Sequence, residues 1–410
     1  MPTREVRARA SPEQRVQVSG LASELWRRLW ARPRTLVLIA GALTAAAFAG
    51  GWTSALHLGA PKASYAKAPA DAVRRVDMRP GPAALQADLE RLVARYGEPV
   101  GIAVSDVTDG WTAQIAGDAP VPQQSVSKLW VALTVLKAVD EGSLSLDQWV
   151  VMRKEDRSVF YQPLASRIRG PDGLRVTLAD LLRHALIESD NAANDKLIQE
   201  VGGAGVVTRA ITEKGLQNVS VGGTERELQT RTAGLDWRAD YGMTWIWKAA
   251  RSRLPDSVRD EALARYLADP PDAATPNGIV RALAALKRGE LLSRASTDFM
   301  LGLMGEARTG TQRLKGGVPR GWTLAHKTGT GPDWRGASVG INDVGLLTAP
   351  DGRTYAVAVM IRQTSRPPSA THALMQGVTR AVAAQWARGQ EVPAEGRDVA
   401  GGPSVAGAGL

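Results

Sequence analysis

The chain has 410 residues, of which 44% are hydrophobic and 22% are charged. This is the composition of a globular protein, and it excludes a disordered chain or a small disulfide-stapled scaffold. There is no cysteine, which excludes disulfides, thiolate zinc sites, iron–sulfur clusters and a cysteine nucleophile. The four histidines show no metal-ligand spacing. We therefore predict neither a metal centre nor a cofactor.

The net charge of +10 is concentrated near the N-terminus, where residues 1–34 contain eight arginines and three glutamates. Such a basic segment is compatible with nucleic-acid binding or with the cytoplasmic flank of a membrane segment. The following residues favour the membrane, because Leu36 to Leu58 form a run of 23 residues without a formal charge. A run of this length can cross a bilayer as a helix. We predict no nucleic-acid partner.

Residues 35–58 are interpreted as either a signal peptide or a retained inner-membrane anchor, and the sequence leaves both open. The small-x-small patterns Ala47-Phe48-Ala49 and Ser64-Tyr65-Ala66 would each fit a cleavage site. Because arginines precede the segment, its N-terminus is expected in the cytoplasm and the rest of the chain in the periplasm. The composition divides that rest into three predicted parts: a linker at 59–80, one catalytic domain at 81–388 and a disordered tail at 389–410.

Apolar patterns predict the helices and strands of residues 81–388. Helical spacing runs from Pro82 to Tyr96 and over 371–388, and helical patterns dominate residues 123–315. Five segments are predicted as strands: Val100–Val107, Trp111–Ala116, Gly321–Ala325, Val344–Thr348 and Thr354–Ile361. Because strands stand at both ends and helices between them, we predict an α/β fold of the α+β type. Its antiparallel sheet would be built from both chain ends, with flanking helices and an inserted all-α lobe.

The first candidate for catalysis is the Ser-x-x-Lys pair Ser125 and Lys128. In a helix this spacing places both side chains on one face, and the positive end of the helix dipole would stabilise an oxyanion beside Ser125. A desolvated lysine there could accept the serine proton. The pattern also occurs at 64–67, in the predicted linker. Taken alone, the motif favours a capping serine and a solvated lysine over a catalytic pair.

Two further motifs follow in chain order. Ser189-Asp190-Asn191 comes directly after a helix that begins with a capping box at 177–180, and it would place a hydroxyl and an amide in a cleft between helices. Lys327-Thr328-Gly329-Thr330 follows a predicted strand and would form an anion-binding strand edge, where the glycine lets a substrate approach. Each motif alone is also compatible with an ordinary turn or an exposed strand.

In this order the three motifs together resemble those of class A serine β-lactamases, within the penicillin-recognising hydrolases. The resemblance covers about residues 82–388. It extends to Tyr161, which is similar to the family's aromatic gatekeeper. It also includes residues 223–229, which are similar to the omega loop and place Glu225 at the position of the catalytic glutamate.

The chain departs from the family pattern in three places. Gln229 replaces the water-positioning asparagine, which puts the speed of deacylation in question. Asn194 follows the Ser-Asp-Asn motif one residue sooner than usual. An extra helical insertion is predicted around residues 236–271, and its role is not indicated by the sequence.

The resemblance implies hydrolysis of β-lactams through an acyl-enzyme on Ser125. Lys128 and, through water, Glu225 are alternative bases for acylation, and Glu225 would activate the deacylating water. The remaining implied roles are proton relay to the leaving nitrogen by Ser189, contact with the acylamide side chain by Asn191, and carboxylate binding by Lys327, Thr328 and Thr330. Tyr161, Gln229 and Gly329 complete the predicted substrate-binding set.

Two other functions remain as alternatives. A D,D-peptidase, penicillin-binding protein or related serine esterase would use the same acylation machinery without rapid deacylation, and Glu225 argues against it. A silent membrane-anchored sensor would be expected to lack Ser125, Lys128 or Lys327, which are all present. We therefore predict a monomeric β-lactamase that confers β-lactam resistance. The sequence does not indicate its preference among penicillins, cephalosporins and carbapenems.

Overall fold

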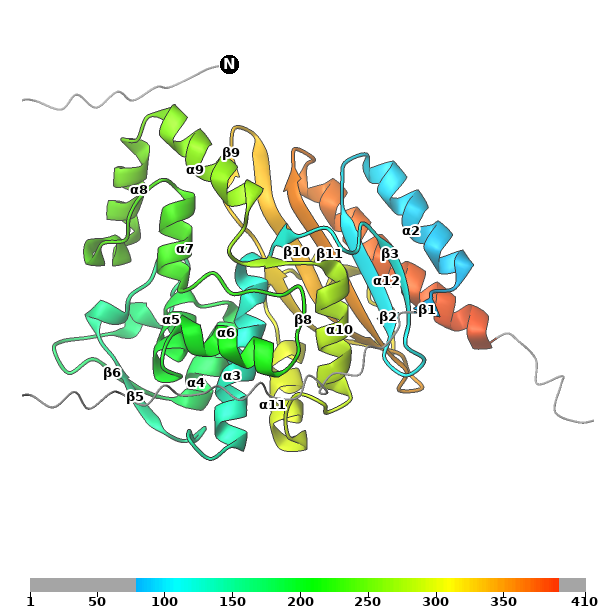
Figure 1. The fold of residues 1–410 in the computed structure, drawn as a ribbon, viewed down its shortest axis with the longest axis horizontal. Helices are drawn as coiled ribbons and strands as arrows, with labels where there is room; N and C mark the ends of the chain where they lie inside the picture. Colours follow the sequence, from blue (N-terminus) through cyan, green and yellow to red (C-terminus); the bar gives the residue numbers. More distant parts are fainter. Residues whose placement is uncertain (1–78, 391–410) are drawn as a thin grey trace, which may run out of the picture. The chain divides into compact units, whose positions relative to one another are not determined.

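The fold is taken from a computed structural model, which describes residues 79–390 (Figure 1). The basic segment, the predicted signal peptide or anchor, nearly all of the predicted linker and nearly all of the predicted tail lie outside these residues. Within 79–390, no helix combines the length and the apolar character needed to cross a bilayer. The membrane segment at 35–58 therefore stays a prediction.

A seven-stranded sheet organises the domain, with strand order β1-β3-β2-β11-β10-β8 and with β9 paired to β10. All neighbouring strands are antiparallel except β1 and β3, which are parallel. The first strand contains two residues that we predicted to belong to the linker. The strands are β1 Arg79–Pro80, β2 Gly101–Asp106, β3 Trp111–Ile115, β8 Thr323–Gly329, β9 Asp333–Trp334, β10 Ala337–Thr348 and β11 Thr354–Thr364.

The sheet joins the two ends of the domain, as the sequence predicted. β2 pairs with β11, and Val104 lies opposite Val357. Because successive side chains of a strand point to opposite faces, Ile102 and Val104 enter one apolar core and Ala103 enters another. Both faces of the sheet must therefore be covered by helices.

Helices α2 (Ala83–Tyr96) and α12 (Pro368–Gln390) lie side by side on one face of the sheet (Figure 1). Leu85 and Leu89, four residues apart on α2, are fully buried in the core that this pair shares with the sheet. The opposite face is covered by α10 (Pro276–Lys287), which contacts β2 and β11. The sheet is thus the middle layer of the domain.

The helical lobe is built around α3 (Lys128–Asp140), whose first nine residues, Lys128–Leu136, are all buried. A helix buried on all sides must be surrounded by other elements. The helices α5 (Asn191–Glu200), α6 (Ala204–Glu213) and α11 (Arg294–Gly305) contact α3. Other elements of this part of the domain are α4 (Leu178–Arg183), α7 (Glu225–Thr232) and the short strand pairs β4 (Val121–Pro122) with β7 (Ala273–Ala274) and β5 (Trp149–Met152) with β6 (Leu174–Thr177). Short helical turns occur at Gln124–Ser127, Lys154–Asp156, Ala165–Arg167, His184–Glu188, Ala239–Gly242 and Leu314–Gly317.

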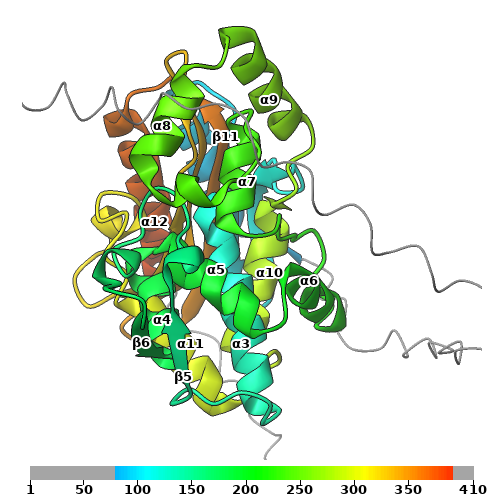
Figure 2. The ribbon, with the colours of Figure 1, turned by 90° about the vertical axis from the view of Figure 1, so that its left-hand side faces the viewer.

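The predicted insertion around residues 236–271 is helical and contains α8 (Thr244–Ser252) and α9 (Asp256–Ala268). Both helices lie at the end of the domain next to α7 (Figures 1 and 2), and α9 runs close to β9, because Trp334 of β9 donates to Asp260 of α9 (Figure 1). A small apolar cluster attaches the insertion to the rest of the domain: Leu228 from α7, Leu263 and Tyr266 from α9, and Val339 from β10. The insertion therefore packs against both the lobe and the sheet.

Candidate active site

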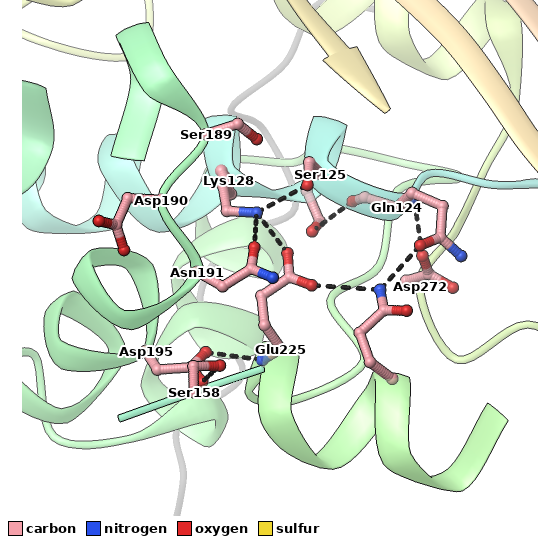
Figure 3. A network of polar contacts seen from close by, with 12 residues as sticks. Gln124, Ser125, Lys128, Ser158, Ser189, Asp190, Asn191, Asp195, Glu225 and Asp272 are labelled. Atoms are coloured by element: carbon pink, nitrogen blue, oxygen red, sulfur yellow. Dashed lines mark hydrogen bonds and ion pairs between the residues drawn. The ribbon is translucent and has the colours of Figure 1, made fainter. Parts of the chain in front are cut away.

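Ser125 lies in the tight helical turn Gln124–Ser127, which leads directly into α3. The sequence predicted Ser125 inside the first turn of the α-helix, so the α-helix begins slightly later than expected. The side chain of Ser125 is partly exposed and lines a cavity of about 940 Å³. The turn preserves the contact expected from the Ser-x-x-Lys spacing, because Lys128 Nζ donates to Ser125 Oγ at 2.7 Å (Figure 3).

Lys128 is fully buried and joins three of the predicted residues. Besides Ser125, its ammonium group donates to Asn191 Oδ1 at 2.8 Å and to Glu225 Oε1 at 2.6 Å (Figure 3). An ammonium group has three protons to donate, so each of them has a partner here. The arrangement links the Ser125 hydroxyl to the Glu225 carboxylate through a single nitrogen atom.

The backbone at the start of α7 is anchored by Asp195 of α5. Its carboxylate accepts hydrogen bonds from the backbone N–H of Glu225 at 2.6 Å and of Arg226 at 3.1 Å. Burial raises the pKa of Asp195 to about 6. Asn194, which the sequence marked as displaced from its usual spacing, has a buried Oδ1 without a hydrogen-bond partner within 79–390. Asp195, the residue after Asn194, therefore holds the start of α7, and the sequence analysis did not identify it as a site residue.

The electrostatic surroundings of Glu225 favour its charged form. Burial by itself would raise the pKa of Glu225, but the positive charge and hydrogen bond of Lys128 outweigh burial and lower it below the usual glutamate value. Gln229 Nε2 also donates to Glu225 Oε2 at 3.3 Å. Glu225 is therefore a buried carboxylate that is ionised at neutral pH and able to accept a proton.

A second lysine–serine pair is formed by Lys327 and Ser189. Lys327 Nζ donates to Ser189 Oγ at 2.9 Å, and Ser189 has the left-handed backbone angle φ of 62°. Non-glycine residues adopt this region at a cost, often at functional sites. The next residue, Asp190, caps α5 by accepting from the Ala193 N–H. Burial, together with the charge of Lys128, lowers the pKa of Lys327 well below its usual value.

The end of β8 brings Thr328, Gly329 and Thr330 to the same cavity region. Thr328 and Thr330 line the cavity, whereas Gly329 serves a packing role. A Cβ atom at position 329 would lie 2.2 Å from the carbonyl oxygen of Gln123. The glycine therefore lets β8 pack against the segment that carries Ser125, a different reason from the substrate approach that we predicted.

Tyr161 and Asn191 lie together on the lobe side of the cavity. Tyr161 is 57% exposed and lines the cavity, and its carbonyl oxygen accepts from the Asn191 N–H at 2.9 Å. Asn191 Nδ2 donates to the Val159 carbonyl at 2.9 Å. These bonds fix the amide orientation that lets Asn191 Oδ1 face Lys128.

Arg313 belongs to the site but was not predicted. Its guanidinium donates to the carbonyl oxygens of Gly329 and Asn342, both at 2.8 Å, and to Thr330 Oγ1 at 2.6 Å. It also lines the cavity, and burial lowers its pKa. No motif surrounds Arg313 in the sequence, so only the folded structure shows that it supplies positive charge at the end of β8.

A polar chain behind Ser125 was also missed. Gln229 Nε2 donates to Gln124 Oε1 at 2.8 Å, and Gln124 Nε2 donates to the Tyr266 hydroxyl at 2.5 Å. Tyr266 donates to Asp272 at 2.9 Å, and Asp272 accepts the Gln124 backbone N–H at 2.7 Å. Gln124 has the left-handed angle φ of 54°. The chain therefore holds a strained backbone next to Ser125 and connects it to Glu225 through Gln229.

All eleven predicted site residues thus lie around Ser125 or at the adjoining end of β8. The arrangement offers a hydroxyl nucleophile, a lysine within hydrogen-bond distance of it, an ionised carboxylate beyond that lysine, and cations near the strand edge. Such a set can perform acyl transfer through a covalent serine intermediate. Within 79–390, no group of three or more acidic or histidine side chains is placed to hold a metal ion.

Comparisons with known proteins agree with this chemistry. Residues 84–386 match the model of the β-lactamase enzyme family. The β-lactamase VEB-1 of Pseudomonas aeruginosa is 26% identical over 293 residues, which are 71% of this chain and 87% of that protein. The crystal structure of the TLA-3 extended-spectrum β-lactamase has 26% identity and a TM-score of 0.61, covering 75% of this chain and 99% of that one. An ancestral class A β-lactamase structure has 26% identity and a TM-score of 0.57, covering 73% and 99%. This chain belongs to the β-lactamase enzyme family.

Proposed function

We propose that this protein is a serine β-lactamase that opens the β-lactam ring through an acyl-enzyme on Ser125 and then hydrolyses that ester with the help of Glu225. The observation that carries the proposal is the bridge formed by Lys128, which donates to Ser125 Oγ at 2.7 Å and to Glu225 Oε1 at 2.6 Å. The same site thus contains a nucleophile and a separate ionised base. Family membership supports the reaction class.

In the acylation step, Ser125 Oγ attacks the lactam carbonyl carbon and its proton passes to a base. Lys128 is in direct contact with Oγ, and Glu225 is reached through Lys128 or a water molecule. The backbone N–H groups of Ser125 and Thr330 are the proposed donors to the developing oxyanion. Ser189, in contact with Lys327, is the proposed donor of a proton to the leaving nitrogen.

In the deacylation step, Glu225 removes a proton from a water molecule that attacks the acyl carbon. The lowered pKa of Glu225 keeps it in the basic form at neutral pH. Gln229 takes the place of a water-positioning amide and donates to both Glu225 and Gln124.

Arg313, Thr328 and Thr330 at the end of β8 would bind the carboxylate of the bicyclic substrate.

A test of the nucleophile uses Ser125→Ala. Wild-type protein quenched with acid during turnover of a penicillin should carry a transient adduct with the mass of the intact drug, whereas the Ser125→Ala variant should show neither this adduct nor turnover. An adduct on the alanine variant would show that another residue is the nucleophile. A wild-type adduct that persists without turnover would favour the alternative D,D-peptidase or penicillin-binding protein, which lacks rapid deacylation.

We also propose that the domain acts in the periplasm as a monomer. The support is the arginine-rich segment before the uncharged run from Leu36 to Leu58. A reporter fused after residue 80 should be active only outside the cytoplasm, and a fusion active only in the cytoplasm would contradict export.

Light scattering of purified residues 59–410 tests whether the protein is a monomer. Protease treatment of spheroplasts and N-terminal sequencing separate a cleaved signal peptide from a retained anchor.

A further inference from the structure

The cavity that contains Ser125 extends onto the helical insertion. Its lining includes Trp247 and Arg251 of α8, Arg259 and Leu263 of α9, and Trp334 of β9. None of these residues has a part in the reaction proposed above. Because the insertion and the end of the sheet both contribute, this part of the cavity is formed only in the folded domain.

Three arginines gather around the indole ring of Trp334. The guanidinium carbons of Arg259, Arg251 and Arg335 lie 4.1, 5.2 and 5.5 Å from the centre of that ring. The face of a tryptophan ring attracts cations at such distances. The ring itself is held in place, because its Nε1 donates to Asp260 Oδ1 at 2.6 Å.

The neighbouring carboxylates balance two of these arginines but not the third. Asp260 pairs with Arg335 at 2.8 Å, and Asp256 pairs with Arg259. Within residues 79–390, the Arg251 side chain forms neither an ion pair nor a hydrogen bond, and its guanidinium lies over the rings of Trp247 and Trp334. Burial and the nearby charge of Arg259 lower the pKa of Arg251. Arg251 thus brings an unbalanced positive charge to the cavity.

The surroundings of Arg251 are aromatic. Its guanidinium lies 6.0 Å from the ring centre of Trp247, and Trp247 packs edge-on against Phe160 at 4.7 Å. Phe160 and Trp247 also line the cavity. A flat ring could therefore stack near a cation here, and the cation would bind an anionic group carried by the same ligand.

Arg251 is separate from the cation at the end of β8. Arg313 is bonded to Gly329 and Thr330, and the proposed function places the carboxylate of the bicyclic substrate there. Arg251 comes from the insertion and contacts Trp247 and Trp334 instead. A substrate with two anionic groups would thus find one cation for each group.

We propose that Arg251, between Trp247 and Trp334, is a specificity-determining subsite for an anionic group on the acylamide side chain of the substrate. This inference rests on the proposed function. The enzyme then favours β-lactams whose side chain carries a carboxylate over otherwise identical β-lactams without one. The charge acts through electrostatic attraction and a charge-assisted hydrogen bond, so the preference weakens as salt increases.

The test uses cefixime and cefdinir, two cephalosporins that differ by a carboxymethyl group on the side-chain oxime oxygen. The measured quantity is the ratio of kcat/KM for cefixime to kcat/KM for cefdinir. Arg251→Met should lower this ratio by at least about tenfold, whereas Arg251→Lys, which keeps the charge, should keep it within about threefold of wild type. Arg251→Gln serves the same purpose if the methionine variant does not fold.

Arg253→Met is the matched control, because Arg253 is an exposed arginine of the same insertion outside the cavity lining. An unchanged ratio in Arg251→Met, or an equal fall in Arg253→Met, overturns the subsite. If wild-type protein hydrolyses neither cephalosporin, the ratio cannot be measured, and the proposed function itself fails only if a penicillin is not hydrolysed either. The subsite is then tested by calorimetric binding to Ser125→Ala with and without Arg251→Met. A loss of affinity for cefixime at least about tenfold larger than for cefdinir supports it, and equal losses overturn it.

Discussion

Replacing Glu225 with glutamine keeps the shape of the side chain but removes its charge, and it should separate the two halves of the reaction. Deacylation needs a group that accepts a proton from water, and an amide cannot do so. Acylation has a second base available, because Lys128 Nζ lies 2.7 Å from Ser125 Oγ. The variant should therefore form the acyl-enzyme and then stall.

The size of the effect follows from the contacts of Glu225. Loss of a positioned general base slows a step by about 10²–10⁴-fold, which is about 3–5 kcal/mol of barrier. The substitution also removes the carboxylate 2.6 Å from Lys128, which is fully buried. Lys128 keeps its contact with Ser125 Oγ in the variant, so the acylation step retains a group that can take the Ser125 proton. Acylation should consequently lose much less than deacylation.

Rapid mixing with a chromogenic cephalosporin gives the measurement. Glu225→Gln should release about one product equivalent per enzyme in a burst and then turn over about 10²–10⁴ times more slowly than wild type. Intact-protein mass spectrometry should show the adduct through the slow phase. Glu227→Gln, the same change on the same helix outside the cavity lining, should behave as wild type. Normal turnover by Glu225→Gln would refute the assignment of the deacylating base.

Three further substitutions test the support around the site. Tyr266→Phe leaves Gln124 and Asp272 without their shared hydroxyl and should lower the free energy of unfolding by about 1–3 kcal/mol in urea denaturation; no change would show that the polar chain is dispensable. Burial raises the pKa of Asp272 from 3.8 to about 6. Between these two pH values the folded protein therefore binds a proton at Asp272 that the unfolded chain has released. The contribution of this carboxyl to the free energy of unfolding consequently falls as the pH rises from about 4 to 6. The free energy of unfolding of Asp272→Asn minus that of wild type should therefore increase by up to about 3 kcal/mol between pH 4 and pH 7, because only wild type loses stability over this range, and a constant difference would contradict the raised pKa. Gly329→Ala places a Cβ 2.2 Å from the Gln123 carbonyl oxygen and should cost about 1–3 kcal/mol of stability together with lower kcat/KM; unchanged melting and activity would show that β8 can move away freely.

The architecture could be predicted from the sequence because its patterns are local and strong. The strand patterns on either side of Asp109-Gly110 give β2 and β3, and the four-residue spacing of Leu85 and Leu89 gives α2. The helix boundaries were less accurate near Ser125. There the backbone enters a tight turn with a left-handed residue at Gln124, and this geometry depends on tertiary contacts that a helical pattern does not contain.

The catalytic centre could be predicted where residues occur in motifs, and it was missed where the fold alone brings residues together. Ser125, Lys128 and Glu225 meet at one ammonium group, as the resemblance implied. Arg313 and Asp195 carry no sequence signal, because each acts through backbone groups of a distant segment. A polar residue that binds backbone leaves no spacing rule, since any neighbouring sequence offers the same N–H and C=O groups.

The insertion reaches the reaction centre by two separate routes, and the two variants distinguish them. Tyr266 of α9 bonds to Gln124 beside the nucleophile, so its loss should affect every substrate and the stability of the fold in the same direction. Arg251 of α8 lines the cavity without bonding to that chain, so its loss should change the ratio between two substrates. If Tyr266→Phe instead alters the ratio of cefixime to cefdinir as strongly as Arg251→Met, the two routes are one coupled unit. Additivity of the double variant then decides the matter, because independent sites add their free energies and coupled sites do not.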